Sequence, residues 1–392
     1  MKLSDFDAIR PVAPEELPAA FDELLADPQF CAIMQSFLPD MPFSAFKERL
    51  YACRDNLEVQ KTFFYAPAHR LIAQCTKGVS LDAQAIPAED RAGSFTFISN
   101  HRDIVLDPAF LCVLLLDNGF RTTAEIAIGD NLLVYPWIRT LVRINKSFIV
   151  ERSLPLRQML ASSKRMSEYM HFAIAEKHEN IWIAQREGRA KDSDDRTQES
   201  LLKMMGMGGS GSPVERIKQL NLVPLTISYE YDPCDFLKAK EFQQKRDEPG
   251  FRKSREDDLR NMQTGIFGQK GRVRYRMATP VNTWIDSLAE LPKAQLFAEL
   301  ARRIDTEIHR GYTIYPGNRV ALDLLRGDHG QAAHYTHEEA AAFEQYLQER
   351  IALVDLPRKD TDFLRHCLLT MYANPLINHL AACGNQPQPS QP

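Results

Sequence analysis

The residues best suited to catalysis lie in one polar segment, residues 100–108, which directly follows an apolar run. This segment contains His101, Asp103 and Asp107. A carboxylate close to a histidine fixes the imidazole tautomer and stabilises the imidazolium, so the pair can remove a proton from an attacking group. We therefore expect His101 to act as a general base, and either aspartate is a candidate partner.

Both aspartates have a geometric argument in their favour. Asp103 is two residues from His101, so in an extended segment the two side chains point the same way. Asp107 precedes Pro108, which is suited to the first turn of a helix, and Asp107 is therefore also placed to cap that helix. A capping role would turn its oxygens toward backbone N–H groups rather than toward the histidine.

Short β-rich runs alternate with helical runs from residue 94 onward, which is typical of a largely parallel sheet with helices on both faces. The predicted strands are Phe95–Ser99, Ala124–Ile128, Ser147–Glu151, Ile181–Gln185, Leu222–Tyr231 and Arg272–Met277. The predicted helices between them are Pro108–Asp117, Asn131–Ile144, Leu154–Lys177 and Thr197–Met205. His101 then lies at the carboxyl end of a strand, where open α/β sheets bind their ligands.

The flanks of this region have helical patterns, so we predict an α/β fold with a mostly parallel central sheet and helical N- and C-terminal segments. Residues 1–90 are expected to form an N-terminal helical cap, 91–290 the α/β domain, 291–380 a C-terminal helical segment and 381–392 a disordered tail. Within the α/β domain, the densely charged residues 236–270 are predicted to form a solvated helical insertion.

Composition excludes several classes of protein. The chain has 392 residues, of which 44% are hydrophobic and 26% charged, so disordered and collagenous classes are excluded. The formal net charge of −4 argues against a nucleic-acid partner. The seven cysteines are scattered and never in C-x-x-C spacing, so we expect reduced thiols in a cytoplasmic protein, with no disulfide framework, metal site or cofactor. The N-terminus lacks the apolar core of a signal peptide and no apolar run reaches the length of a membrane span, so any membrane contact is expected to be peripheral.

Two other motifs resemble known functional motifs, but their sequence context does not support those functions. The H-R-D triplet at 101–103 opens the catalytic loop of protein kinases, but the other kinase motifs are absent from the chain. The run at 206–211 matches G-x-G-x-x-G, yet it follows a helical run rather than a strand. It is predicted to be a flexible loop, with Ser212 and Pro213 starting the next helix.

Three further segments accompany Asn100-His101 along the chain. Phe148–Arg152 brings an arginine to the end of a predicted strand, Glu187–Lys191 is a glycine turn rich in cations, and Val223–Leu225 is a strand interrupted by proline. In this order and spacing, the four segments resemble the four motif blocks of the glycerophospholipid acyltransferase family, which includes the lysophosphatidic acid and glycerol-3-phosphate acyltransferases. The resemblance covers residues 95–277 and leaves the helical flanks outside it.

The blocks differ in how well they match. The second and fourth blocks match cleanly, whereas the third reads E-G-R-A-K in place of the usual E-G-T-R-S, with its arginine one position forward. In the first block, N-H-x4-D, Asp107 lies one residue too far from His101 and Asp103 lies too near. A loop that leads into a helix can absorb one extra residue as a bulge but cannot make up a three-residue deficit. The resemblance therefore favours Asp107 as the partner of His101, with Asp103 supporting the pair or contacting a substrate hydroxyl.

The resemblance implies a peripheral membrane O-acyltransferase of phospholipid biosynthesis, which needs no cofactor. Its donor would be acyl-CoA or acyl carrier protein, and its acceptor a hydroxyl of a glycerol-phosphate type lipid. The residues expected to bind substrate are Asn100, Arg102, Arg152, Glu187, Gly188, Arg189 and Lys191. The cations among them can donate charge-assisted hydrogen bonds to a phosphate. The basic residues between 236 and 276 could serve an anionic donor or an anionic lipid surface.

Two alternatives stay open at this point. The shifted third block weakens the argument for a phosphate, which leaves an acyltransferase that acts on a non-phosphate lipid precursor. A catalytically silent lipid-binding protein could also keep this fold, and such a protein would not need to bring a carboxylate to His101.

Overall fold

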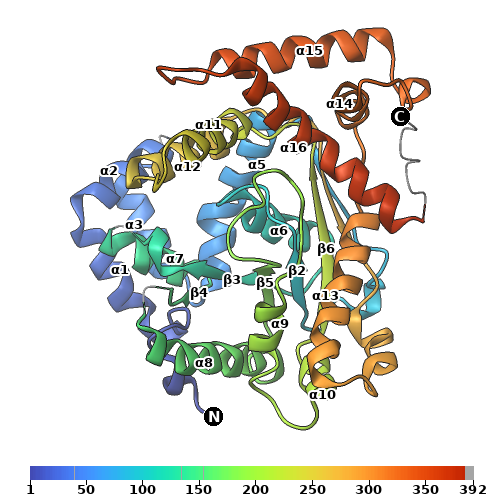
Figure 1. The fold of residues 1–392 in the computed structure, drawn as a ribbon. Coiled ribbons are helices and arrows are strands. Elements are labelled where there is room, and N and C mark those ends of the chain that lie inside the picture. Colours follow the sequence, from blue (N-terminus) through green and yellow to red (C-terminus); the bar gives the residue numbers. More distant parts are fainter. Residues whose placement is uncertain (39, 134, 153, 385–392) are drawn as a thin grey trace.

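The computed structural model describes residues 1–38, 40–133, 135–152 and 154–384 (Figure 1). Seven strands form one sheet in the order β1-β7-β6-β2-β5-β3-β4. The strands are β1 (Val79–Asp82), β2 (Thr96–Ser99), β3 (Ala124–Gly129), β4 (Ser147–Val150), β5 (Asn180–Ala184), β6 (Leu222–Tyr229) and β7 (Val273–Met277). The predicted α/β fold with a mostly parallel sheet and helical terminal segments is confirmed.

The α-helices lie before, between and after these strands (Figure 1). They are α1 (Leu17–Ala26), α2 (Pro28–Phe37), α3 (Phe43–Ala52), α4 (Asn56–Val59), α5 (Tyr65–Cys75), α6 (Leu106–Asp117), α7 (Pro136–Ile144), α8 (Leu156–Ala175), α9 (Glu199–Met205), α10 (Pro213–Lys218), α11 (Asp235–Asp247), α12 (Arg255–Phe267), α13 (Lys293–Arg310), α14 (Pro316–Arg326), α15 (His337–Ala352) and α16 (Thr361–Ala382). Ser212 caps α10 at the position predicted, by accepting a hydrogen bond from the N–H of Glu215.

Strand direction defines two different edges of the sheet. β6, β2, β5, β3 and β4 are mutually parallel, so their carboxyl ends meet at one edge. β7 runs antiparallel to β6 and parallel to β1, so these two strands end at the opposite edge. The loops that follow β2, β4, β5 and β6 therefore gather at a single edge. These loops contain His101, Asp103 and the residues expected to bind substrate, whereas Asp107 lies in the first turn of α6.

The six predicted strands are present within two residues at each end, but β1 was not predicted. It falls inside residues 1–90, which were expected to form an N-terminal helical cap, and it adds a strand to that segment. β1 is a short strand at the edge of the sheet, and its four residues are exposed or only partly buried. A segment of this kind has neither the buried apolar run nor the sustained alternation that marks a strand in a sequence.

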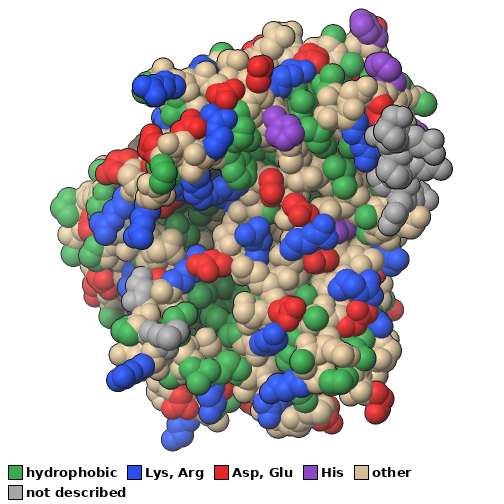
Figure 2. Space-filling model, in the orientation of Figure 1, with side chains coloured by type: hydrophobic (Ala, Val, Ile, Leu, Met, Phe, Trp, Pro, Cys, Tyr) green, Lys and Arg blue, Asp and Glu red, His purple; other side chains and the backbone are tan. Residues whose placement is uncertain are grey.

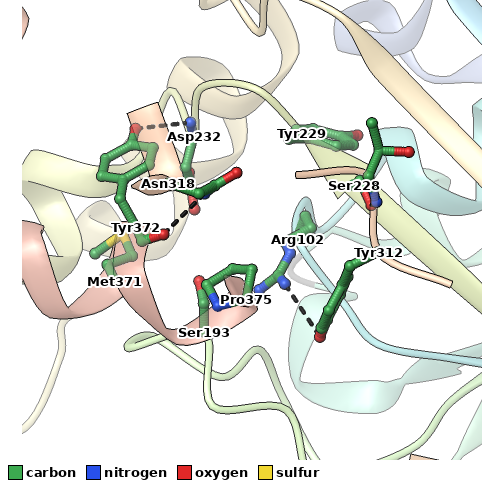
Figure 3. Close-up of a pocket in the computed structure, with 11 residues that line it drawn as sticks. Arg102, Ser193, Ser228, Tyr229, Asp232, Tyr312, Asn318, Met371, Tyr372 and Pro375 are labelled. Carbon is green, nitrogen blue, oxygen red and sulfur yellow. Dashed lines mark hydrogen bonds between the residues drawn. The ribbon is translucent and has the colours of Figure 1, made fainter. Parts of the chain in front are cut away.

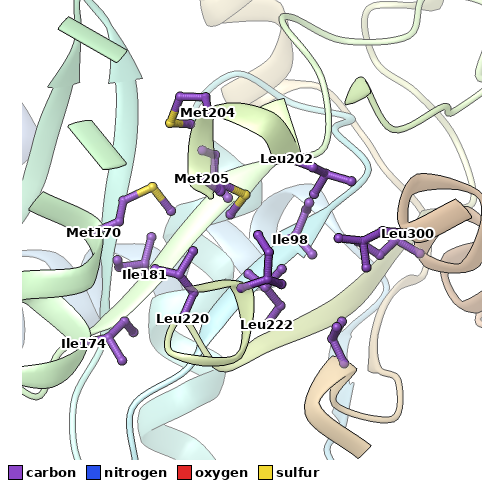
Figure 4. Packing of buried hydrophobic residues seen from close by; sticks show 14 of the residues in the cluster. Ile98, Met170, Ile174, Ile181, Leu202, Met204, Met205, Leu220, Leu222 and Leu300 are labelled. Atoms are coloured by element: carbon purple, nitrogen blue, oxygen red, sulfur yellow. The ribbon is translucent and has the colours of Figure 1, made fainter. Parts of the chain in front are cut away.

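Helices cover both faces of the sheet, and successive strand residues pack on opposite faces. Ile98, Ile181 and Leu222 pack in a buried cluster with residues of α8, α9 and α13 (Figure 4). Their chain neighbours Phe97 and Trp182 belong to a second cluster, which includes residues of α6. Because both faces of these strands are buried, their sequences are continuous apolar runs rather than alternating apolar and polar residues.

The terminal helical segments pack on the α/β domain through clusters of their own. Helices α1 to α3 pack with α7, and helices α14 to α16 pack with α11. The prediction that residues 236–270 are a solvated insertion is wrong for α11, because Phe236, Leu237 and Ala239 are buried in the cluster with α16. The charged side chains of α11 concealed the apolar ones in the sequence.

At the C-terminus, α16 continues to Ala382, two residues into the predicted tail, and residues 385–392 of that prediction lie outside the described residues. No helix in the described part of the chain is long and apolar enough to cross a membrane.

Candidate active site

His101 follows β2 by two residues, at the edge where the parallel strands end. Asn100, which joins it to the strand, is fully buried. Its amide nitrogen donates to the carbonyl oxygen of Ile227 at 2.9 Å, and its side-chain oxygen accepts from the N–H of Ile227 at 2.8 Å. Asn100 thus fastens the start of the loop to β6 and positions His101, contrary to the expectation that its amide binds substrate.

The imidazole of His101 is paired with Asp107. His101 Nδ1 lies 2.8 Å from Asp107 Oδ2, and the Asp107 carboxylate is fully buried while the histidine side chain is 13% exposed. The same Asp107 oxygen accepts the backbone N–H groups of Arg102 and Asp103, at 2.6 and 3.0 Å. A carboxylate held by two backbone donors cannot rotate away from the imidazole, so His101 Nε2 is the ring nitrogen left for a substrate.

Asp103 has a different position. Its Oδ1 accepts the backbone N–H groups of Val105 and Leu106, at 2.9 and 2.7 Å, and so caps the turn that leads into α6. Capping by Asp107, the alternative left open by the sequence, is not observed, because Asp103 has that role. Burial, followed by the nearby Asp107 carboxylate, raises the pKa of Asp103 above its usual value. Its Oδ2 faces Gly265 of α12, where a Cβ atom would overlap it, so α12 packs closely over the His101 loop.

Trp182, which the sequence reading did not assign to the site, forms a wall beside the histidine. Its ring meets the imidazole of His101 edge to face with centroids 5.4 Å apart. Its indole N–H donates to the hydroxyl of Ser99 at 3.0 Å, which fixes the ring on the neighbouring strand. The pairing of β2 with β5 brings it there, and its place within an apolar strand gave no sign of this role in the sequence.

Arg102 points away from His101 and into the protein. It is 5% exposed, and one of its terminal nitrogens donates to Asp195 Oδ2 at 2.6 Å. The other, Nη1, has no hydrogen-bond partner among the described residues. Figure 3 shows the guanidinium beside Tyr312, in a cavity between the end of β6 and α16. Arg102 is therefore held mainly by its ion pair with Asp195, and it lines that cavity.

The loops after β4 and β5 meet beside this histidine loop. Arg152 Nη1 lies 3.6 Å from Glu187 Oε1, so the second and third sequence blocks are adjacent. Both side chains are well exposed, at 35% and 69%. Gly188 has a φ of 67°, in the left-handed region that favours glycine, and it turns the chain so that the next residue faces inward.

Arg189 and Lys191 both face the α11 and α12 hairpin but differ in how fully they are paired. Arg189 donates to Asn261 Oδ1 at 3.2 Å, and its buried Nη1 has no hydrogen-bond partner among the described residues. Lys191 forms an ion pair with Glu241, which also contacts Lys245. Burial lowers the pKa of Lys191 to about 8 despite that partner. Arg189 is therefore the cation with donor capacity to spare.

The surface over this region is hollowed on the side of α7 and α12, where basic side chains lie above hydrophobic ones (Figure 2). Val105, four residues after His101, is 36% exposed, and Leu160 near the start of α8 is 70% exposed. Within the described residues, no group of three His, Cys, Asp or Glu side chains is arranged to hold a metal ion.

Comparison with known proteins gives little beyond this geometry. No family model matches the chain, and no curated protein matches it. Among solved structures, the chain is similar to the 1-acyl-sn-glycerophosphate (LPA) acyltransferase PlsC from Thermotoga maritima, at 12% sequence identity and a TM-score of 0.35. The match covers 74% of this chain and 93% of that one. At this TM-score we draw no conclusion from the similarity, and the proposals below depend on the residues themselves.

The C-terminal segment contributes residues that sequence reasoning did not place at the site. Tyr312, Asn318 and Tyr372 line the same cavity as Arg102, although they lie far along the chain from His101. Isolated tyrosines and asparagines in helical stretches gave no signal of this role. Tyr312 lies in the loop between α13 and α14, where the N–H of Thr313 donates to Ser228 Oγ of β6. Asn318 of α14 donates to the carbonyl oxygen of Tyr372 in α16.

Proposed function

We propose that the protein is an O-acyltransferase in which His101 is the general base. The observation that carries this proposal is the His101 and Asp107 pair, with one ring nitrogen held by a pinned, buried carboxylate and the other left for a substrate. The strand-end position supports it, because this edge of an open α/β sheet is where ligands bind. The resemblance of the four sequence blocks to the glycerophospholipid acyltransferases supplies the reaction class.

The proposed reaction transfers an acyl group from a thioester to an alcohol. His101 Nε2 takes the proton of the acceptor hydroxyl as its oxygen attacks the thioester carbonyl. A C–O bond forms, the C–S bond breaks, and the proton passes from the imidazolium to the leaving thiolate. Asp107 stabilises the imidazolium formed between these two proton transfers, and such general-base assistance contributes roughly 10²- to 10⁴-fold in rate.

The acceptor is proposed to carry a phosphate bound by Arg189 and Arg152. The free nitrogen of Arg189 and the exposed guanidinium of Arg152 support this, because guanidinium groups bind phosphate through paired N–H donors. Lys191 is a weaker candidate for binding the phosphate, since it already forms an ion pair with Glu241. The same ion pair favours the alternative function, in which the acceptor carries no phosphate.

The donor is proposed to be acyl-CoA or acyl carrier protein, used by a cytoplasmic protein that meets the membrane only at its surface. The basic side chains above the hollow suit an anionic donor, and the exposed apolar side chains of Val105 and Leu160 suit an acyl chain or a lipid surface.

The function is tested by measuring thiol release from acyl-CoA and from acyl carrier protein across phosphorylated and unphosphorylated acceptors. We expect turnover with a glycerol-phosphate type acceptor, and none above the blank with the His101→Ala protein. Turnover only with unphosphorylated acceptors would favour the non-phosphate alternative. No acceptor-dependent release from either donor, by a protein with an unchanged thermal midpoint, would favour the silent lipid-binding protein.

A further inference from the structure

A small polar cavity lies beside the His101 loop, and nothing above assigns it a role. It is lined by Arg102, by Ser228 and Tyr229 at the end of β6, and by residues of the C-terminal segment (Figure 3). Resting on the acyltransferase function proposed above, we propose that this cavity binds a non-reacting hydroxymethyl group of the acceptor. That group would accept a hydrogen bond from Arg102 Nη1 and donate one to Asp232.

The position of the cavity relates it to the reaction. Arg102 is the residue after His101, and β6 is paired with β2, so the cavity and the histidine share one edge of the sheet. The proposal therefore places the reacting hydroxyl at His101 and the neighbouring hydroxymethyl group of the same acceptor in the cavity.

The charges around the cavity favour a neutral guest. Arg102 and Asp232 have opposite charges and both line it. Each is already paired, Arg102 with Asp195 and Asp232 with Lys238. A guest anion would meet the Asp232 carboxylate and a guest cation would meet the guanidinium, so neither is favoured. A hydroxyl group can accept from one and donate to the other.

Unused hydrogen-bonding capacity shows that the cavity is built for a polar guest. Arg102 Nη1 is buried without a partner among the described residues, and a buried guanidinium N–H left unpaired is costly. Ser193 and Ser228 also line the cavity, and Ser228 Oγ already accepts the N–H of Thr313, which leaves its O–H to donate. These groups offer both donors and acceptors to a hydroxyl.

The size of the cavity limits the guest to a small group. Its volume is about 30 Å³. A site needs roughly 10–15 Å³ to hold one water-sized group, so about two such groups fit, which corresponds to the carbon and the oxygen of one hydroxymethyl group. This volume suits a hydroxymethyl group, and the proposal assigns the phosphate to the cations of the neighbouring loops.

Residues outside the four sequence blocks determine this selectivity. The lining residues that belong to the C-terminal segment are Tyr312, Thr313, Asn318, Met371, Tyr372 and Pro375. The inference therefore gives that segment a part in choosing the acceptor, beyond its packing against α11.

The test compares two ligands that differ by this one hydroxyl. Glycerol 3-phosphate has a free primary hydroxyl, and 2-hydroxypropyl phosphate lacks it. Their binding to the full-length protein is measured by titration calorimetry without an acyl donor, so no turnover occurs. We expect glycerol 3-phosphate to bind about tenfold more tightly, the effect of one hydrogen bond to a charged group.

Arg102→Lys removes Nη1 but keeps a cation for Asp195, and we expect it to reduce the preference to less than about twofold. Arg10→Lys is the matched control, because Arg10 is also 5% exposed and ion-paired, in its case with Glu16 in the N-terminal segment. It should keep the full preference. If Arg102→Lys fails to fold, Ser193→Ala replaces it, with an expected loss of about two- to threefold in the preference.

Equal binding of the two ligands by the unaltered protein would overturn this inference, and so would binding of neither. Thiol release measured on the same preparation separates the two proposals. Turnover with equal acceptor affinities leaves the acyltransferase intact and removes the hydroxymethyl site, whereas absent turnover removes the proposed function itself.

Discussion

Among the residues that the structure describes, two histidine–aspartate side-chain pairs occur, and helix α6 contributes the aspartate of both. Asp107 near its start lies 2.8 Å from His101, and Asp117 at its end lies 3.4 Å from His69 of α5. In the first pair the side chains are 13% and 0% exposed, whereas in the second they are 41% and 31% exposed. The residue types are the same, but the surroundings differ.

The comparison shows that a His–Asp contact is not in itself a candidate catalytic base. Backbone N–H groups fix the carboxylate of Asp107, and His101 lies just after the end of a buried strand. Asp117 instead also accepts a hydrogen bond from the hydroxyl of Tyr65. This pair lies on a solvated helix surface, where ion pairs contribute little to stability. Each prediction below challenges or refines this contrast.

The largest expected effect is that of Asp107→Asn. An amide cannot stabilise the imidazolium and favours the wrong tautomer of His101, so kcat/KM for thiol release should fall by about 10²- to 10⁴-fold. Asp117→Asn is the matched control and should change kcat/KM by less than about twofold. Equal effects of the two substitutions, in proteins with comparable thermal midpoints, would remove the distinction between the pairs.

Arg189→Ala tests the cations in the loops after β4 and β5. Because Arg189 has an unpaired buried nitrogen, its loss should raise the KM for a phosphorylated acceptor about tenfold and leave the donor KM within about twofold. Arg152→Ala should shift the same KM in the same direction. A rise in the donor KM alone would assign these arginines to the CoA or carrier-protein side.

Asp103→Asn should have a small effect on turnover, within about threefold, because asparagine caps a helix nearly as well as aspartate. The kinetic assay used for Asp107→Asn measures it directly. If Asp103→Asn abolishes turnover and Asp107→Asn does not, the partner of His101 has been wrongly assigned, although the acyltransferase proposal survives.

Asp305 of α13 anchors the loop opposite His101 by accepting both the N–H and the hydroxyl of Thr197. Burial raises its pKa from 3.8 to about 6, so the folded state binds this proton more tightly than the unfolded state does. The free energy of unfolding should therefore fall by up to about 3 kcal/mol as the pH rises from 4 to 6 through this group. Asp305→Asn should remove that fall, as measured by denaturant unfolding at several pH values. An unchanged pH dependence would contradict it.

The strands could be predicted from the sequence because burial on both faces leaves a plain apolar run. The position of His101 followed from the end of such a run. The partner of His101 was harder to identify, because Asp103 and Asp107 both suit a cap and a contact, and the choice depends on backbone N–H groups that a sequence does not display.

Long-range packing was beyond prediction. The ion pair of Arg102 with Asp195 and the cavity wall at Tyr312 and Tyr372 join segments that are far apart in the chain. The prediction that α11 is solvated was wrong because its buried apolar residues alternate with charged ones in the sequence. Residues such as Asn100, identified by motif as binding substrate, can instead hold two strands together.

The central claim is that His101, and not simply any paired histidine, performs the chemistry. The most direct measurement compares kcat/KM for thiol release in the unaltered protein, His101→Ala and His69→Ala, with thermal midpoints measured alongside. The account predicts a loss of more than about 100-fold for His101→Ala with a nearly unchanged midpoint, and less than about twofold for His69→Ala. Turnover by His101→Ala within about threefold of the unaltered protein would contradict it.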